Sequence, residues 1–241
     1  MTSQGADPSE SPSLCSAASD VTAFELKFLL DASAAAAVEG WARRSLKPDP
    51  HGDHGTYRTT TLYLDTAGLD VYFKSPGYRR SKYRVRYYAG TPLVHVERKR
   101  RQGDRVRKWR EAIPTEGIGQ LLEPDGPAGW FGERVRDRQL GPSCWLTYTR
   151  TAFFGMAVGE PIRLTLDREV SGMPAADWAA PAPFDGRRLV ADQVILELKY
   201  RVALPPLFRD LLGLLPAQVP GGSKYGRCIE AWGLARGSAD A

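Results

Sequence analysis

In one predicted strand of this sequence, residues 81–88, every second side chain is cationic. The cations are Lys82, Arg84 and Arg86. Because a β-strand sends successive side chains to opposite faces, one face of this strand is wholly cationic. Three cations in neighbouring positions on one face repel one another unless an anion lies among them. The spacing therefore predicts a face that binds a polyanion.

A second strand continues this pattern after a Gly/Pro turn at residues 89–92. In residues 93–101, His95, Glu97 and Lys99 share one face, and valines occupy the other. Arginine binds phosphate oxygens with a planar fork and lysine supplies a point charge, so a mixture of the two indicates a phosphate chain. Carboxylates among such cations are suited to hold Mg²⁺ or Mn²⁺, which bridge phosphates in transfer reactions.

The same alternation adds charged side chains in the other predicted strands. The cations expected to point inward are Lys27, Lys82, Arg84, Arg86, Lys99, Lys108, Arg150, Arg163 and Lys199, and the acidic residues are Glu25, Glu97, Asp167 and Glu197. An empty core could not hold them, because burying an unpaired charge costs several kcal/mol. The charges therefore predict a water-filled channel that binds anions.

Eight predicted strands position these side chains. They span residues 21–30, 56–65, 81–88, 93–101, 104–113, 144–154, 161–170 and 193–202. No regular helical crossovers separate them, so the sheet should be mainly antiparallel. The fold class that we expect is α+β, with an eight-stranded, mainly antiparallel β tunnel (a closed barrel) and flanking helices. These helices are expected at residues 31–46, 205–215 and 223–235, with short ones within 115–140 and Asp31 as an N-cap.

Length and composition predict one folded domain. The chain has 241 residues, 42% of them hydrophobic, and a net charge of +5. We expect a disordered tail at residues 1–20, a tunnel domain at 21–236 and a C-terminal tail at 237–241. The three widely spaced cysteines fit neither a disulfide framework nor a metal motif and indicate a reducing compartment. Without a signal peptide or a long apolar stretch, the protein is expected to be cytoplasmic.

Nine short patterns occur in an order that identifies a family resemblance. They are Glu25-x-Lys27, Tyr63-x-Asp65, Lys82-x-Arg84-x-Arg86-Tyr87, Glu97-Arg98-Lys99, Lys108, Arg150-Thr151-Ala152-Phe153, Arg163-x-Thr165-x-Asp167, Glu197-x-Lys199-Tyr200 and Ser223-Lys224-Tyr225. Across residues 22–234, the chain resembles the polyphosphate polymerase domain of the vacuolar transporter chaperone (VTC) proteins. These belong to the triphosphate tunnel metalloenzyme, or CYTH-like, superfamily.

The resemblance implies a tunnel that binds the triphosphate of ATP and transfers its γ-phosphoryl group to inorganic polyphosphate. It implies phosphate-binding roles for Lys82, Arg84, Arg86, Lys99, Lys108, Arg150, Arg163, Lys199, Ser223 and Lys224. It implies catalytic roles for Lys27, Lys224, Arg84 and Arg86, with Glu197 and Glu25 holding Mn²⁺ or Mg²⁺. The other expected tunnel-lining residues are Glu97, Asp167 and Tyr63.

Departures from the superfamily pattern leave other functions open. The hydrolases carry Glu-x-Glu-x-Lys, and Ala23 stands at the first acidic position here, which favours a polymerase over a metal-dependent triphosphatase or a nucleotide-cyclising enzyme. A non-catalytic module that binds polyphosphate or another polyanion is the alternative from a different class. The sequence shows neither the SPX domain nor the membrane helices of the eukaryotic proteins, so regulation and export are not implied. A membrane protein is among the partners that the resemblance allows.

Simpler explanations compete with several of these motifs. The cationic strand face could be solvated, each Glu-x-Lys could be a local ion pair, and Ser223 could only cap a helix. His51 and His54 lie in a predicted loop without further ligands, which argues against zinc. No Walker-type phosphate loop is present. Residues 98–101 are basic, but strand alternation divides them between two faces, which argues against nucleic acid as a partner.

Overall fold

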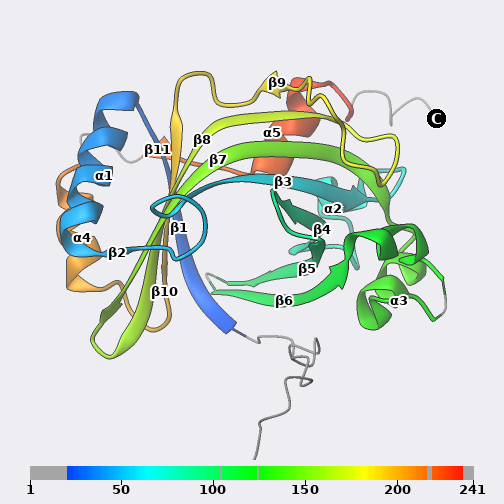
Figure 1. Ribbon diagram of the computed structural model, residues 1–241, viewed down its shortest axis with the longest axis horizontal. Coiled ribbons are helices and arrows are strands. Elements are labelled where there is room, and N and C mark those ends of the chain that lie inside the picture. The colour runs from blue at the N-terminus through cyan, green and yellow to red at the C-terminus, as the bar shows by residue number, and fades with distance from the viewer. Residues whose placement is uncertain (1–20, 104, 124, 216–218, 236–241) are drawn as a thin grey trace, which may run out of the picture.

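The computed structural model describes residues 21–103, 105–123, 125–215 and 219–235. The tail expected at residues 1–20 and the one at 237–241 lie outside these described residues. Within them, eight long antiparallel strands form a closed barrel, and three two-residue strands pair with its margins. The predicted fold class is therefore confirmed (Figure 1).

Barrel closure follows from the strand order β7-β3-β4-β5-β6-β1-β10-β8, with β8 pairing back to β7. The long strands are β1 (Val21–Leu30), β3 (Thr56–Asp65), β4 (Ser81–Tyr88), β5 (Leu93–Gln102), β6 (Arg105–Pro114), β7 (Gly141–Ala157), β8 (Glu160–Pro174) and β10 (Val194–Tyr200). The short ones are β2 (Lys47–Pro48), β9 (Arg187–Arg188) and β11 (Val219–Pro220). Closure leaves the eight-strand circuit without a free edge.

Strands β7 and β8 are longer than the sequence predicts. Ala157 pairs with Glu160 across the turn Val158-Gly159, so the two strands form one long hairpin. Both turn residues have a positive φ, as a two-residue hairpin of the primed type requires. Alternation predicts only the amphipathic part of a strand. The two strands of this hairpin extend beyond that part because their backbones continue to pair with each other.

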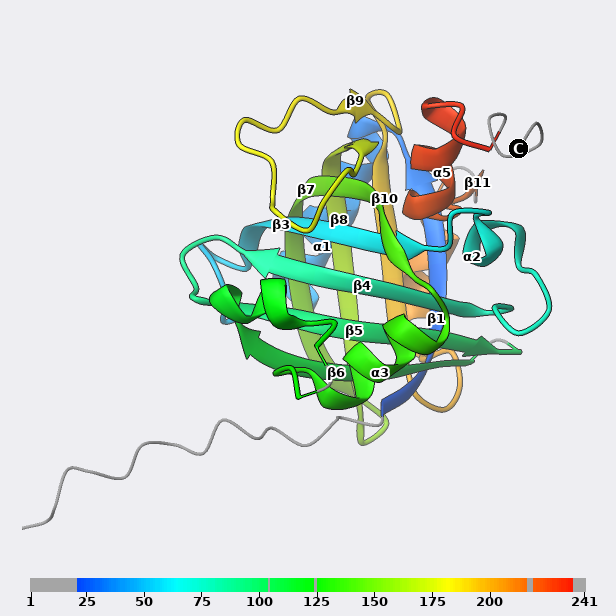
Figure 2. The same ribbon diagram turned by 90° about the vertical axis from the view of Figure 1, so that its right-hand side faces the viewer.

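The helices cover the outside of the barrel. They are α1 (Ala32–Ser45), α2 (Asp70–Phe73), α3 (Gly129–Asp137), α4 (Pro206–Gly213) and α5 (Lys224–Ala231), with a 3-10 helix at Thr115–Gln120. Helix α1 starts where predicted, because the Asp31 carboxylate accepts a hydrogen bond from the Ala34 amide at 2.7 Å. Helices α1 and α4 lie together at one side, and α3 lies over β4, β5 and β6 (Figures 1 and 2). No described helix is long and apolar enough to cross a membrane.

The apolar core lies outside the barrel wall, in two clusters beneath these helices. One cluster joins the outer faces of β3, β4, β5 and β7 to α3 and α5, with Tyr83 and Phe131 fully buried. The other joins β1, β8 and β10 to α1 and α4 around Leu196 and Phe208. Each fully buried side chain of this size contributes about 1.5–3 kcal/mol. Outward-pointing residues therefore stabilise the fold, and the inward faces are left for charged side chains.

Candidate functional site

The barrel encloses a cavity of about 290 Å³ with a strongly cationic wall. The charged lining residues are Glu25, Lys27, Lys82, Arg84, Arg86, Lys99, Lys108, Arg110, Arg150, Arg163, Glu197, Lys199 and Lys224. With Ser223, they include every residue that the sequence assigns to phosphate binding. The structure thus brings these side chains together, and their roles stay predictions.

A row of three lysines crosses one wall. Lys82 on β4 lies opposite Lys99 on β5, and Lys99 lies opposite Lys108 on β6. Like charges that lie directly opposite in a sheet destabilise it. Burial, with nearby cations, lowers the pKa of Lys82 to about 8 and that of Lys108 to about 7. Burial thus disfavours the charged form of both lysines, and the neighbouring cations add to this effect.

Glu97 supplies the counter-charge in the next row and lies behind the cations. Its carboxylate is fully buried, accepts a hydrogen bond from Arg84 Nε at 2.6 Å and pairs with Lys108 Nζ at 2.6 Å. Burial alone would raise its pKa, yet the Arg84 and Arg86 guanidinium groups hold the pKa of Glu97 well below its usual range. Glu97 therefore fixes Arg84 and does not reach the cavity surface, where the sequence analysis places it.

Arg86 differs from Arg84 because its hydrogen bonds go to hydroxyl groups. Its Nε donates to Thr61 at 3.4 Å and its Nη2 to Tyr148 at 3.2 Å. In the described part of the chain, no carboxylate lies within ion-pair distance of this buried guanidinium. Arg86 is therefore held in place with its full charge available to a ligand.

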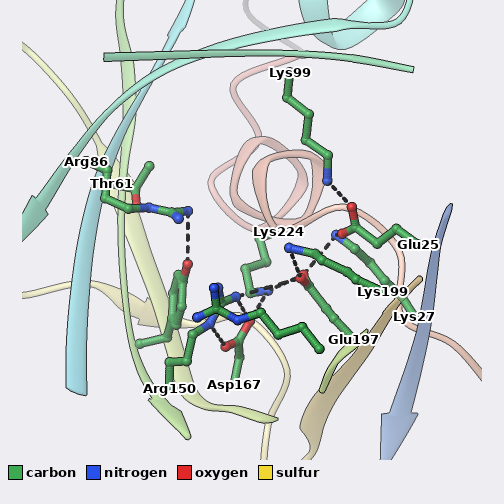
Figure 3. Close-up of polar contacts among 12 residues, drawn as sticks. Glu25, Lys27, Thr61, Arg86, Lys99, Arg150, Asp167, Glu197, Lys199 and Lys224 are labelled. Atoms are coloured by element: carbon green, nitrogen blue, oxygen red, sulfur yellow. Dashed lines mark hydrogen bonds and ion pairs between the residues drawn. The ribbon is translucent and has the colours of Figure 1, made fainter. Parts of the chain in front are cut away.

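The two Glu-x-Lys motifs interlock on the opposite wall. The antiparallel register of β1 and β10 puts Glu25 opposite Lys199 and Lys27 opposite Glu197. Lys27 Nζ lies 3.1 Å from Glu25 and 3.0 Å from Glu197, and Figure 3 shows the three side chains turned toward one another. Lys99 reaches across from β5 to Glu25 at 2.5 Å. Although burial acts against it, the Lys27 ammonium helps hold the pKa of both carboxyls below their usual range.

Helix α5 brings Lys224 into the cavity at its first residue. Ser223 caps the helix by accepting a hydrogen bond from the Gly226 amide, and it also accepts one from Lys82 Nζ at 2.5 Å. Lys224 Nζ lies 2.5 Å from Asp167 and 3.2 Å from Glu197. The capping explanation for Ser223 is thus correct, and the same residue also contacts the cationic wall.

Asp167 is fully buried behind this lysine and is absent from the cavity lining. It accepts two hydrogen bonds from Arg150, at 2.6 and 2.7 Å. Burial would raise its pKa, but Arg150 and Lys224 lower it. Asp167 therefore resembles Glu97: each carboxylate anchors an arginine from behind, although the sequence analysis expects both to line the tunnel.

A buried carboxylate also holds the far side of α5. Asp65, at the end of β3, accepts hydrogen bonds from three backbone amides of residues 66–72 and from the Tyr225 hydroxyl at 2.5 Å. The Tyr225 ring stacks on Tyr63, whose hydroxyl accepts a hydrogen bond from Arg84 at 3.1 Å. The Tyr63-x-Asp65 motif thus links the position of α5 to that of a lining arginine.

Several contributors to the cavity are not identified from the sequence. Arg110, Tyr57, Tyr88 and Tyr148 line the wall. Each lies two residues from an expected lining position or continues the inward face of its strand, so strict alternation could have found them. Asp49 could not have been found this way, since it lies in the loop after β2 and reaches Arg163 Nη2 at 2.5 Å.

The histidines take no part in a metal cluster. Within the described residues, no group of three His, Cys, Asp or Glu is arranged to hold a metal. His51 and His54 are exposed on their loop. His95, an inward-facing residue of β5, packs edge-on against Tyr88, and burial with the charge of Arg110 lowers its pKa to about 4.

Glu25 and Glu197 fit a divalent cation that a bound phosphate would share. They are the two carboxylates on the cavity wall, and one ammonium, that of Lys27, pairs with both. Glu25 Oε1 is buried, and its contact is the Lys27 ammonium at 3.1 Å. Mg²⁺ takes one or two carboxylates together with substrate phosphates, so this donor set suits it better than an all-protein cage would. A cation held here would replace the ion pairs of Lys27.

Comparison with known proteins gives one family match. The sequence model of the VTC domain matches residues 22–232. No curated protein matches this sequence.

Solved structures with the same fold share little sequence with this chain. A candidate adenylate cyclase from Bacillus halodurans is 14% identical, with a TM-score of 0.54 over 87% of this chain and 96% of that one. A candidate adenylyl cyclase from Hippeastrum, described as having a dominant triphosphatase activity, is 16% identical, with a TM-score of 0.52 over 88% and 95%. The PH1819 protein of Pyrococcus horikoshii is 14% identical, with a TM-score of 0.51 over 87% and 99%.

Proposed function

Because the chain belongs to the VTC domain family, whose tunnel fold serves triphosphate binding and phosphoryl transfer, we propose that it is an ATP-dependent polyphosphate polymerase. In each cycle the bond between the γ-phosphorus and the β,γ-bridging oxygen breaks. A terminal oxygen of the polyphosphate forms the new bond to that phosphorus, and ADP leaves. The product is one phosphate longer and stays in the barrel.

The observation that carries this proposal is the excess of positive charge in an enclosed barrel. Eleven lysines and arginines line the cavity against two glutamates, and Glu97 and Asp167 behind them do not restore the balance. Burial lowers the pKa of Lys108 to about 7, a cost that an anion beside it would remove. A triphosphate and a polyphosphate end carry the negative charge that such a wall lacks.

The side chains divide into two groups by their contacts. Arg84 and Arg150 are oriented by carboxylates behind them, and Arg86 by hydroxyl groups, so all three are held at the cavity wall, where they can bind phosphate oxygens. Lys27 and Lys224 both contact Glu197 and would lie beside the transferred group. Fixed cations stabilise the charge that spreads over the phosphoryl oxygens as the bond breaks.

A divalent cation held by Glu25 and Glu197 would supply further charge neutralisation for the β- and γ-phosphate oxygens. The same two carboxylates also orient Lys27 and Lys99, so they contribute to the site through the lysines as well. Removing either carboxylate therefore changes the lysine positions together with cation binding.

A triphosphatase of the same fold is the second candidate, and the Hippeastrum protein supports it by its described activity. Ala23 lines the cavity beside Glu25 and Lys27. A methyl group at this point adds neither a metal ligand nor a base for water. This favours transfer to a polyphosphate end over transfer to water.

The test is to incubate the protein with ATP and Mn²⁺, or with Mg²⁺, and to separate polyphosphate from orthophosphate. Polyphosphate from the wild type supports the polymerase, orthophosphate alone supports the triphosphatase, and no ATP consumption leaves a module that only binds polyanions. Lys224→Ala should abolish the product. Arg188→Ala, which removes an exposed arginine on β9 away from the cavity, is the matched control and should leave the product unchanged.

A further inference from the structure

The outside of the barrel carries a second group of arginines, around β5, β6 and α3. We name it the outer arginine surface, and it consists of Arg79, Arg80, Arg98, Arg100, Arg134 and Arg138. Strand alternation puts Arg98 and Arg100 on the face of β5 opposite the lining residue Lys99. Helix α3 lies over this face (Figure 2). Among the described residues, no carboxylate forms an ion pair with any of the six.

Arg98 shows that these charges are close together and held in place. Its guanidinium lies over the ring of Trp109 at 5.0 Å and over that of Tyr83 at 5.7 Å. Its Nε is buried without a hydrogen-bond partner. Burial first, and then the nearby charges of Arg134 and Arg100, lower its pKa. Aromatic contacts thus fix the guanidinium, and its positive charge is left without an anion.

The outer arginine surface lies beside the end of the lysine row, where β4 begins and β5 ends. Arg100 lies directly opposite Ser81, and the next residue, Lys82, belongs to the lysine row inside. The Arg101 amide donates to the Arg80 carbonyl at 2.7 Å, which joins the ends of β5 and β4 at this rim. Lys82 and Lys99 of the lysine row are therefore next in sequence to Ser81 and Arg100, so an anionic chain that leaves the lysine row here would pass close to the outer arginines.

We propose that the outer arginine surface binds the part of a polyphosphate chain that extends beyond the barrel. This inference rests on the proposed function, since it concerns a chain longer than the cavity. Arginine forks suit successive phosphates, and a chain bound both inside and outside gains affinity because the second contact is intramolecular. No exposed large apolar side chain lies on the described parts of β4, β5, β6 or α3, although a folded protein or a membrane surface would use one.

The experiment compares binding of tripolyphosphate and of long-chain polyphosphate by the full-length protein. Arg100→Gln/Arg134→Gln neutralises two exposed members of the surface whose side chains make no hydrogen bond or ion pair within the described residues. Arg188→Gln/Arg209→Gln makes the same charge change at exposed sites on β9 and α4. Tripolyphosphate should bind equally to all three proteins. Long-chain polyphosphate should bind the first variant about tenfold more weakly. The slope of the logarithm of its binding constant against the logarithm of the salt concentration should fall in magnitude by roughly two.

The outcomes separate this inference from the proposed function. Equal binding of the long chain by the two variants overturns the inference and leaves the polymerase proposal standing. Wild-type protein that binds neither phosphate overturns both. Loss of binding to vesicles of anionic lipid in the first variant, with polyphosphate binding unchanged, assigns the surface to a membrane and also overturns the inference.

Discussion

Single side chains in this cavity act through the partners behind them, and Glu197 is the main example. It lies close to Lys27 and Lys224 and is the carboxylate expected to hold a divalent cation. Glu197→Gln keeps the side-chain size and removes the charge. Polyphosphate synthesis should therefore be lost, while the lysines, freed from their counter-charge, should bind tripolyphosphate at least as tightly.

The same variant should be less stable without a ligand, by roughly 3 kcal/mol, because it leaves buried lysines uncompensated. Denaturant unfolding with and without tripolyphosphate measures this, and the ligand should restore most of the loss. Glu160→Gln is the control, since Glu160 pairs only loosely with Arg201 at 3.8 Å at a half-exposed site. Unchanged synthesis by Glu197→Gln would contradict the assigned role.

The two central arginines should differ when each is replaced. Arg86→Ala should weaken tripolyphosphate binding and leave the unliganded protein as stable, or slightly more so, since it removes a buried charge that has only hydroxyl partners. Arg84→Ala should weaken binding and also destabilise the protein, because the Glu97 Oε2 atom loses the two guanidinium nitrogens that contact it. Thermal unfolding of both variants without a ligand makes the comparison. Equal stability of the two would argue against the anchoring role of Glu97.

Lys108 should make polyanion binding depend on pH. Its pKa is lowered to about 7 in the free protein, and a bound phosphate would raise it. The contribution of Lys108 to affinity is therefore complete below this value and is lost as the pH rises toward the pKa of the complex. Calorimetric titration with tripolyphosphate between about pH 6 and 9 should show binding that weakens with increasing pH, and proton uptake that is greatest between the pKa values of the free and bound protein.

Lys108→Arg tests this assignment, because arginine keeps its charge throughout that range. Its binding should vary less with pH than that of the wild type. A pH profile identical to that of the wild type would assign the dependence to other groups, such as Lys82, whose pKa is lowered to about 8.

At the scale of the elements, α5 is held in place by a contact far from the phosphate wall. The Tyr225 hydroxyl donates to the buried Asp65 carboxylate at 2.5 Å, and Lys224 precedes it in the chain. Tyr225→Phe should cost about 1–2 kcal/mol of stability. It should also lower kcat more than it changes the KM for ATP, since Lys224 loses its fixed position.

Tyr72→Phe is the matched control for this helix, because the Tyr72 hydroxyl makes only a 3.5 Å contact with the exposed Glu230. It should change neither stability nor kcat by a measurable amount. If Tyr225→Phe lowered stability and left kcat unchanged, the Asp65 contact would be structural and would not position Lys224.

Alternation in the sequence predicts which face of each strand points inward but not how deep a side chain lies. All eight long strands are found where alternation predicts them, although β7 and β8 extend further, and α1 starts where its Asp31 cap predicts. Glu97 and Asp167 point inward but are fully buried, and the arginines that they anchor, Arg84 and Arg150, line the cavity. The inward face of β6 is left ambiguous by the sequence, and pairing with both β5 and β1 decides it in favour of Lys108 and Arg110.

At the scale of the whole molecule, the free barrel is expected to be strained by its own charge. Tripolyphosphate should relieve this repulsion and raise the melting temperature. At a concentration of about 100 times Kd, a ligand adds about 2.7 kcal/mol, which for a chain of this length corresponds to roughly 5–10 °C. Differential scanning fluorimetry measures the shift, and sodium sulfate at equal ionic strength is the control. A melting temperature indifferent to tripolyphosphate would contradict the anion site.

The position of the apolar core outside the barrel wall determines which positions of this protein can tolerate substitution during evolution. Substitutions among the lumen side chains leave the two outer clusters around Phe131 and Phe208 intact. Inward positions that carry no buried ion pair, such as Arg86, can therefore vary in charge while the scaffold keeps its shape. Laboratory evolution confined to such positions should consequently yield new substrate preferences at a low rate of unfolded variants, whereas a library of equal size on the outward positions should yield mostly insoluble protein.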